Sequence, residues 1–282
     1  MYKYLFLLLI LVFNIGMIAA QTQTDEQTPV KERPYRIGAA LGYSFSGYRE
    51  ETYSQINKYL NTLTYTIDGN IEKKKLLHSL NMEFFMGNAE SKTPMEPVLM
   101  RDFDQVSGEA YYMASFPQYM YIRAYLEYAL DCRLWGTASF PGYLGGAFRT
   151  DTYLQFAYYP SITALMSLDI HASQKWIINR ENELILCLGF PLFGFAVRPP
   201  YAGADQAIIK YASEEPFKII TLGKIVSLHN YWALFGNLKY QHRINPLLSL
   251  YSGIGFELSR INYPRPRIDS ILTLNSGLAF TF

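Results

Sequence analysis

Residues 119–140 of the chain read YMYIRAYLEYALDCRLWGTASF, and their side chains alternate in character. From position 120 onward every second residue is mainly apolar, whereas the positions between carry charges of both signs, on Arg123, Glu127, Asp131 and Arg133. A helix does not separate two such sets, because residues two apart lie on nearly opposite sides of it, whereas in a strand they share a face. The alternation is also longer than a typical strand of a soluble domain. We therefore expect a tilted strand that crosses a membrane, with one apolar and one polar face.

The first twenty residues have the layout of a secretory signal peptide. Lys3 is their only charge, and an apolar run covers Tyr4–Phe13. We predict cleavage after Ala20. The alternative is an uncleaved anchor, which is disfavoured because Asn14 interrupts the run well short of the roughly 20 residues that a spanning helix needs. Residues 21–34 are polar and are predicted to form a flexible periplasmic lead.

The last alternating segment ends at the C-terminal residue. Its apolar face consists of Leu272, Leu274, Leu278, Phe280 and Phe282. An exported chain with such a final strand and a C-terminal phenylalanine resembles bacterial outer-membrane β-barrel proteins. The resemblance covers most of residues 35–282 and implies an antiparallel transmembrane barrel in the bacterial outer membrane. It also implies two partners, the outer-membrane lipid and the barrel-insertion machinery, which would read Phe280 and Phe282 as its signal.

About twelve strands follow from the recurring alternation, with short turns on the periplasmic side together with both termini. The expected ranges are 35–45, 58–67, 71–86, 108–116, 119–135, 147–159, 161–174, 183–195, 217–227, 229–242, 246–260 and 270–282. The expected periplasmic turns are Asp68-Gly69-Asn70, Phe116-Pro117-Gln118, Tyr159-Pro160-Ser161 and Ile244-Asn245-Pro246. Residues 196–216 are too long for a periplasmic turn in this scheme, so ten strands, or a further strand in 207–212, are the alternatives.

The composition agrees with a membrane barrel and excludes other classes. The 25 Lys+Arg and 24 Asp+Glu residues leave a net charge of +1, without the basic excess of a nucleic-acid-binding protein. The 24 tyrosines fit the aromatic girdles of such barrels, where an apolar ring meets lipid and its hydroxyl meets water. A soluble secreted β-sandwich is the alternative, but it usually has shorter strands and lacks the C-terminal phenylalanine signal.

Four histidines and two cysteines are present, and no pair of histidines has metal-ligand spacing. Cys132 and Cys187 belong to opposite kinds of strand face. We expect no metal site, no cofactor and no disulfide.

One cluster suggests chemistry, because Asp169, His171 and Ser173 share a face of one predicted strand. A His-x-Ser pair resembles the catalytic pair of outer-membrane phospholipases and lipid A deacylases, in which the histidine activates the serine as an acyl nucleophile. In those enzymes the pair points outward to the lipid, and an asparagine follows the serine. Here Gln174 follows, and the alternation points His171 and Ser173 into the lumen. A lipid-modifying hydrolase is therefore the alternative, and a polar lumen lining is the main interpretation.

The lumen-facing residues Arg123, Glu127, Asp131 and Arg133 allow two interpretations of their own. They could line a pore that passes polar solutes, or they could fill a narrow barrel with ion pairs and hydrogen bonds. The sequence thus predicts an outer-membrane barrel that acts as a pore, or as a structural or surface-interaction protein. The basic segment Arg260–Arg267 (RINYPRPR) is expected to project outward, toward anionic sugar or lipid headgroups or simply into solvent.

Overall fold

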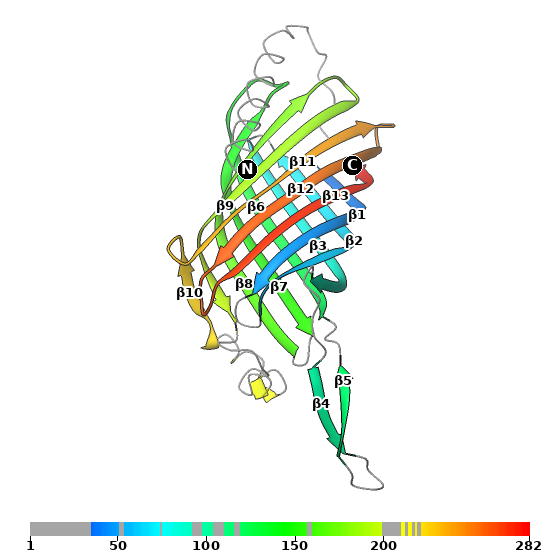
Figure 1. Ribbon diagram of the computed structural model, residues 1–282. Coiled ribbons are helices and arrows are strands. Elements are labelled where there is room, and N and C mark those ends of the chain that lie inside the picture. Colours follow the sequence, from blue (N-terminus) through cyan, green and yellow to red (C-terminus); the bar gives the residue numbers. More distant parts are fainter. Residues whose placement is uncertain are drawn as a thin grey trace.

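Ten long strands form a closed antiparallel barrel in the computed structural model (Figure 1). The structure describes residues 35–50, 54–73, 75–91, 98–103, 110–115, 119–156, 160–198, 210–211, 214–215, 218 and 221–282. The barrel strands are β1 (Tyr35–Glu50), β2 (Ser54–Lys73), β3 (Leu76–Ser91), β6 (Tyr119–Trp135), β7 (Gly142–Phe156), β8 (Pro160–Ile177), β9 (Asn182–Val197), β11 (Tyr231–Arg243), β12 (Leu248–Ile261) and β13 (Arg267–Thr281). Three shorter strands are β4 (Val98–Phe103), β5 (Ala110–Ser115) and β10 (Lys224–Ser227).

The ring closes between the first and the last barrel strand. Going round it, the order is β1-β2-β3-β6-β7-β8-β9-β11-β12-β13 and back to β1. At the seam the Tyr35 N–H donates to the Phe282 carbonyl (3.3 Å), and the Phe282 N–H donates to the Tyr35 carbonyl (3.0 Å). Closure of this kind removes the free sheet edges that would leave backbone groups unpaired in hydrocarbon.

The alternation of the sequence becomes an outer and an inner surface. On β1, Leu41 and Tyr43 point outward and are 61% and 42% exposed. Ser44, the next residue after Tyr43, points inward and is fully buried inside the barrel. β13 alternates in the same way along almost its whole length. The outer surface is therefore an apolar belt and the inner surface is polar, which is the pattern of barrels that span membranes. No helix of the described residues is long and apolar enough to cross a membrane.

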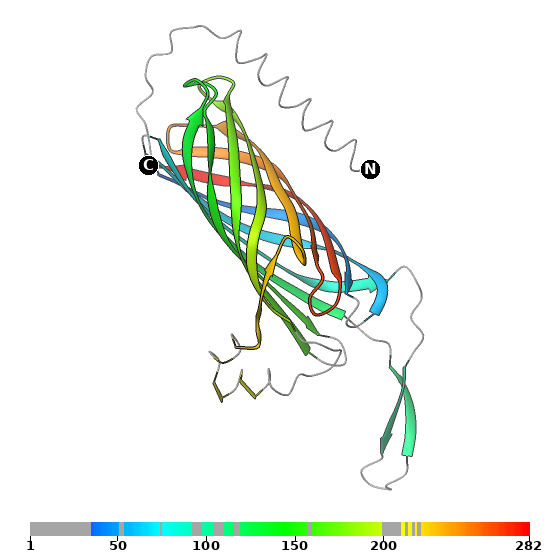
Figure 2. The same cartoon turned by 90° about the vertical axis from the view of Figure 1, so that its left-hand side faces the viewer.

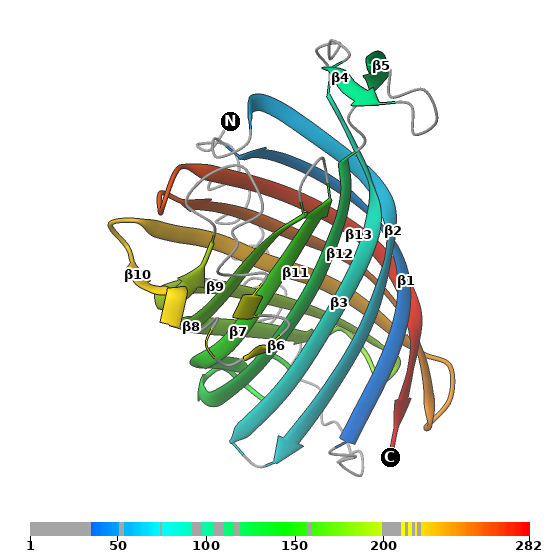
Figure 3. The same cartoon turned by 90° about the horizontal axis from the view of Figure 1, so that it is seen from below.

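The two ends of the barrel differ. Both termini of the barrel and the turns β2–β3, β6–β7, β8–β9 and β11–β12 lie at one end. The two longest connections, β3–β6 and β9–β10, lie at the other end, which we call the loop end. At the loop end β4 and β5 pair into a separate hairpin that projects beyond the barrel (Figure 2). Figure 3, seen from the loop end, shows the strands encircling the lumen.

The prediction of an antiparallel barrel is confirmed, and the structure has the ten strands that the sequence left as an alternative to twelve. The predicted strand 108–116 corresponds to β5. β5 is hydrogen-bonded to β4 in a separate two-stranded sheet, so it is not part of the ring. The predicted strand 217–227 is reduced to β10, which pairs only with the last part of β9. The surplus strands are thus the two that fall in the loops.

Two of the expected turns are corrected. The Asp68-Gly69-Asn70 segment lies inside β2, because Gly69 is paired on both sides, with Ile37 and with Leu80. Pro160 begins β8 at the loop end rather than near the termini, in a position where a strand tolerates the missing N–H of proline.

The turn at Ile244–Pro246 lies at the terminus end, as predicted. There the Asn245 side-chain oxygen accepts bonds from the N–H groups of Leu247 and Leu248, both at 2.8 Å. Residues 116–118, the predicted signal peptide (1–20) and the lead (21–34) lie outside the described residues, so those assignments stay predictions.

Candidate functional site

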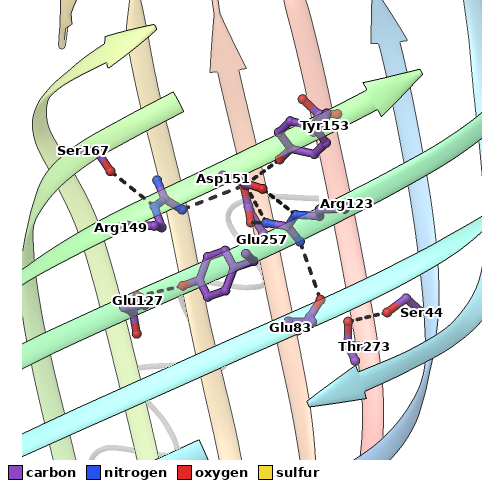
Figure 4. A network of polar contacts seen from close by, with 12 residues as sticks. Ser44, Glu83, Arg123, Glu127, Arg149, Asp151, Tyr153, Ser167, Glu257 and Thr273 are labelled. Atoms are coloured by element: carbon purple, nitrogen blue, oxygen red, sulfur yellow. Dashed lines mark hydrogen bonds and ion pairs between the residues drawn. The ribbon is translucent and has the colours of Figure 1, made fainter. Parts of the chain in front are cut away.

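An ion-pair network crosses the middle of the lumen (Figure 4). Arg123 on β6 donates from Nε and Nη2 to both carboxylate oxygens of Asp151 on β7, at 2.8 and 2.7 Å. Its Nη2 also donates to Glu257 on β12, and its Nη1 lies 3.7 Å from Glu83 on β3. β6 and β12 are five strands apart whichever way the ten-strand ring is counted, so they stand opposite each other. The Arg123–Glu257 pair therefore spans the full width of the barrel.

Arg149 on β7 extends this network toward β8 and β11. Its Nε lies 3.2 Å from an Asp169 carboxylate oxygen, and its Nη2 donates to the hydroxyl of Tyr231. The guanidinium carbon lies 4.2 Å from the ring centroid of Phe235, which is cation–π distance. With 1% of its surface exposed, Arg149 is among the largest fully buried side chains of the described residues.

A second polar layer lies toward the loop end. Arg267 on β13 pairs with both oxygens of Asp269 (2.7 and 2.8 Å) and donates to the Tyr121 hydroxyl on β6 at 2.5 Å. Its guanidinium carbon lies 4.1 Å from the ring centroid of Tyr153. Tyr48 stacks on Tyr121 with ring centroids 4.9 Å apart. Aromatic rings and one arginine thus pack together at this level of the lumen.

Further layers lie toward the termini. Asp68 on β2 accepts a hydrogen bond from the Tyr251 hydroxyl (2.7 Å), and pairs with Lys239 on β11 (3.0 Å) and Arg36 (3.1 Å). Below it, Lys175 on β8 pairs with Glu183 on β9 (3.0 Å) and lies 3.8 Å from Glu72 on β2. Lys239 and Asp68 come from strands four apart in the ring, as do Lys175 and Glu72. The lumen is bridged at each of these levels.

The sequence-predicted lumen residues do not all lie at one site. Arg123, Glu127 and Asp131 are buried in the interior, where Glu127 accepts a hydrogen bond from the Tyr125 hydroxyl at 2.8 Å. Arg133 lies at the terminus end, where its Nη2 donates to the Thr137 carbonyl at 2.6 Å in an exposed position. The four residues belong to different levels of the barrel.

His171 and Ser173 are both buried in the lumen, but they do not pair. The His171 Nδ1 is 2.7 Å from Asp131 on β6, while the Ser173 hydroxyl has no hydrogen-bond partner in the described structure. Gly145 of β7 lies between Asp131 and His171, and a Cβ there would meet Asp131 atoms at 2.6 Å. His171 therefore pairs with a buried carboxylate and not with Ser173. This arrangement does not favour the hydrolase.

A cavity of about 80 Å³ lies in the middle of the lumen, between side chains that include Glu83, Arg123, His171 and Cys187. That volume suits a few water molecules. Among the residues that the structure describes, no group of three or more His, Cys, Asp and Glu side chains could hold a metal ion.

Sequence reasoning missed the central partners, namely Asp151, Arg149 and Glu257. Each is a charged residue at an inward position of an alternating segment, so parity alone could have assigned them to the lumen. Which of them meet depends on the shear and closure of the ring, which parity does not determine.

The comparisons with known proteins address the fold. No family model matches the chain, and no curated protein matches its sequence. Among solved structures, the outer-membrane protease OmpT from Escherichia coli is similar with a TM-score of 0.51 at 8% identity, covering 91% of this chain and 99% of that chain.

Two further solved barrels are less similar. The translocator domain of the autotransporter NalP from Neisseria meningitidis has a TM-score of 0.42 at 8% identity, covering 96% of this chain and 95% of its own. An outer-membrane channel from Pseudomonas putida F1 has a TM-score of 0.37 at 9% identity, covering 89% of this chain and 100% of its own. The likeness to the first of these structures shows an outer-membrane β-barrel fold, which confirms the predicted fold class. A likeness at these identities shows the fold alone and selects no activity.

Proposed function

We propose that the protein is a closed-lumen outer-membrane barrel that acts through the segments it holds outside the membrane, and not as an open pore. The observation that carries this proposal is the pairing of Arg123 with Glu257 across the full width of the ring. Barrels of about eight strands have interiors that side chains fill, whereas those of 16–18 strands leave an aqueous channel. A ten-strand barrel with long inward side chains lies near the filled limit.

The buried ion pairs support the proposal that the side chains in the lumen do not move aside for a solute. Arg123 and Arg149 are 3% and 1% exposed, and both contact carboxylates in the interior. Removing one partner of such a buried pair leaves an uncompensated charge, which costs about 3–5 kcal/mol. A passing solute would have to break several of these contacts at once.

The β4–β5 hairpin at the loop end is the segment that such a scaffold would present outside the membrane. The β4–β5 hairpin projects from the barrel and has only two strands, so both of its outer edges carry unpaired backbone groups. An isolated two-stranded hairpin is marginally stable in water. A partner that adds a strand to one edge would stabilise it and would itself be held by main-chain hydrogen bonds.

Single-channel recording in planar bilayers tests the closed lumen. The purified, folded protein is expected to insert without stable conductance steps, under conditions in which a general porin conducts. An Arg123→Ala, Glu257→Ala variant removes the central crossing and is expected to give steps or increased noise. Regular conductance of the unchanged protein would refute the proposal and favour the pore.

A further inference from the structure

The wall of the barrel forks between β9 and β11. Their backbone ladder ends at the pair Gly189 and Phe235. Pro191 follows on β9, where it has no N–H to donate, and the register against β8 shifts so that Leu192 is an extra residue. Pairing on that side of β9 resumes only at Phe193, with β10 instead of β11. At the loop end the wall therefore divides into β10 on one side and the start of β11 on the other (Figure 1).

Apolar side chains close the fork from within. They form one buried cluster, which consists of Leu165, Ala196, Val226, Tyr231, Ala233 and Ile261. Tyr263, in the β12–β13 connection, packs against this cluster. Packing thus replaces backbone hydrogen bonds at the fork, and the inner side of the wall there is apolar instead of polar.

The outer side of the fork is unusually apolar as well. Ile225 of β10 is 73% exposed, the highest value among the large apolar side chains that the structure describes. Leu228 in the following turn is 50% exposed, and Phe193 on β9 is 48% exposed. These side chains continue the lipid-facing belt up to its rim at the loop end, where acyl chains meet headgroups.

Three cations lie on the same rim. Lys224 begins β10, with its Nζ 4.8 Å from the ring centroid of Tyr263. Arg265 lies in the same connection as Tyr263, and Arg260 lies near the end of β12. All three are exposed.

The connection that carries Arg265 is fixed by hydrogen bonds to its backbone. Arg198 donates from Nη1 to the carbonyls of Tyr263 and Arg265, the latter at 3.0 Å. The acidic residues of the adjoining strands, Glu257 and Asp269, are buried inside the lumen with Arg123 and Arg267. The exposed cations of this rim are therefore not neutralised by those carboxylates.

We propose that this sector binds an anionic lipid of the outer leaflet. Its phosphate would contact Lys224, Arg260 and Arg265, and its acyl chains would lie over Phe193 and Ile225. The adjacency of an exposed apolar patch and three exposed cations at headgroup level carries this inference, because basic clusters at a membrane surface attract anionic headgroups. The site is separate from the lumen and does not depend on the proposed closed-lumen function.

Trp232 offers an optical probe of the site, since it lies opposite Arg260 in the β11–β12 ladder. In a Trp135→Phe, Trp176→Phe variant it is the sole tryptophan. Phosphatidylglycerol with brominated acyl chains, added to the protein in neutral detergent, is expected to quench Trp232 saturably. The midpoint should lie at least about tenfold lower than with brominated phosphatidylcholine.

Charge-removal variants localise the effect. Replacing Lys224, Arg260 and Arg265 by glutamine should abolish the preference for phosphatidylglycerol. The matched control replaces three cations of the terminus end, Lys75, Arg133 and Arg180, and should retain the preference. Native mass spectrometry of the chain with all its tryptophans, with unbrominated lipids, gives the same comparison if the tryptophan variant does not fold. Equal affinity for the two lipids, or equal loss in both triple variants, would overturn the proposal.

Discussion

Arg123 on β6 and Glu257 on β12 form an ion pair between strands that stand opposite each other in the ring. The same guanidinium holds Asp151 on the neighbouring strand β7 with two hydrogen bonds. One side chain therefore ties together both walls of the barrel. Removing either the buried guanidinium or its carboxylates would leave an uncompensated charge in the interior. The stability of the barrel and the proposed closure of its lumen therefore depend on the same contacts.

Replacing Arg123 by alanine should destabilise the barrel strongly. Asp151 and Glu257 would lose their central partner in the interior, and the expected loss is about 3–5 kcal/mol. Urea unfolding in lipid vesicles measures this loss of stability as a lower midpoint. The folded fraction is read from the band that changes its gel migration on boiling. The matched control is Arg133→Ala on the same strand. Arg133 is partly exposed and donates to the Thr137 carbonyl, so its removal should change stability by only about 0.5 kcal/mol. Equal effects of the two variants would contradict the central role of Arg123.

Adjacent glycines on β7 should respond differently to the same substitution. A Cβ at Gly145 would lie 2.0 Å from the Leu130 carbonyl oxygen, and would separate Asp131 from His171. At Gly146, which faces outward, the nearest atom to a Cβ is 3.6 Å away, which is ordinary contact. Gly145→Val is therefore expected to prevent folding into the heat-modifiable form, and Gly146→Val to permit it. Refolding into detergent micelles, scored by gel shift, distinguishes them; normal folding of Gly145→Val would refute the packing argument.

The wall of the barrel could be predicted from the sequence because strand alternation is a local property. The predicted strand 119–135 coincides with β6, and the predicted strand 183–195 lies within β9. The errors arose where local signals compete with the ladder. Asp68-Gly69-Asn70 has turn chemistry, but Gly69 is paired on both sides inside β2.

The contents of the lumen could be predicted only as a set of residues. His171 and Ser173 share a face by parity, yet His171 pairs with Asp131, which is 40 positions earlier in the chain. That pairing depends on Gly145, which lets two strands on either side of β7 bring their side chains together. The closure and shear of the ring decide such contacts, and they are properties of all ten strands together.

The two cysteines should report which face of the wall they occupy. Cys132 is exposed on the outer face, whereas Cys187 borders the cavity in the lumen. A bulky maleimide should label the folded protein once in detergent, and Cys132→Ser should abolish that labelling. After unfolding in urea, both thiols of the unchanged chain should react. Labelling of Cys187 at a comparable rate in the folded protein would indicate that the lumen is open to large solutes.

Phe282, which directly follows β13, should matter for assembly in cells more than for the stability of the finished barrel. Phe282 is 57% exposed and stacks on Tyr35 with ring centroids 5.9 Å apart, so little packing is lost on truncation to alanine. If the insertion machinery recognises this residue, Phe282→Ala should lower the amount of heat-modifiable protein in the outer-membrane fraction several-fold. Refolding of the same purified variant into detergent should proceed as for the unchanged chain. Leu278→Ala is the matched control, because Leu278 lies on the same face of β13 and is 45% exposed. Equal yields of the two variants in cells would show that the terminal residue is not the signal, and a refolding defect confined to Phe282→Ala would assign its role to the closure of β1 on β13.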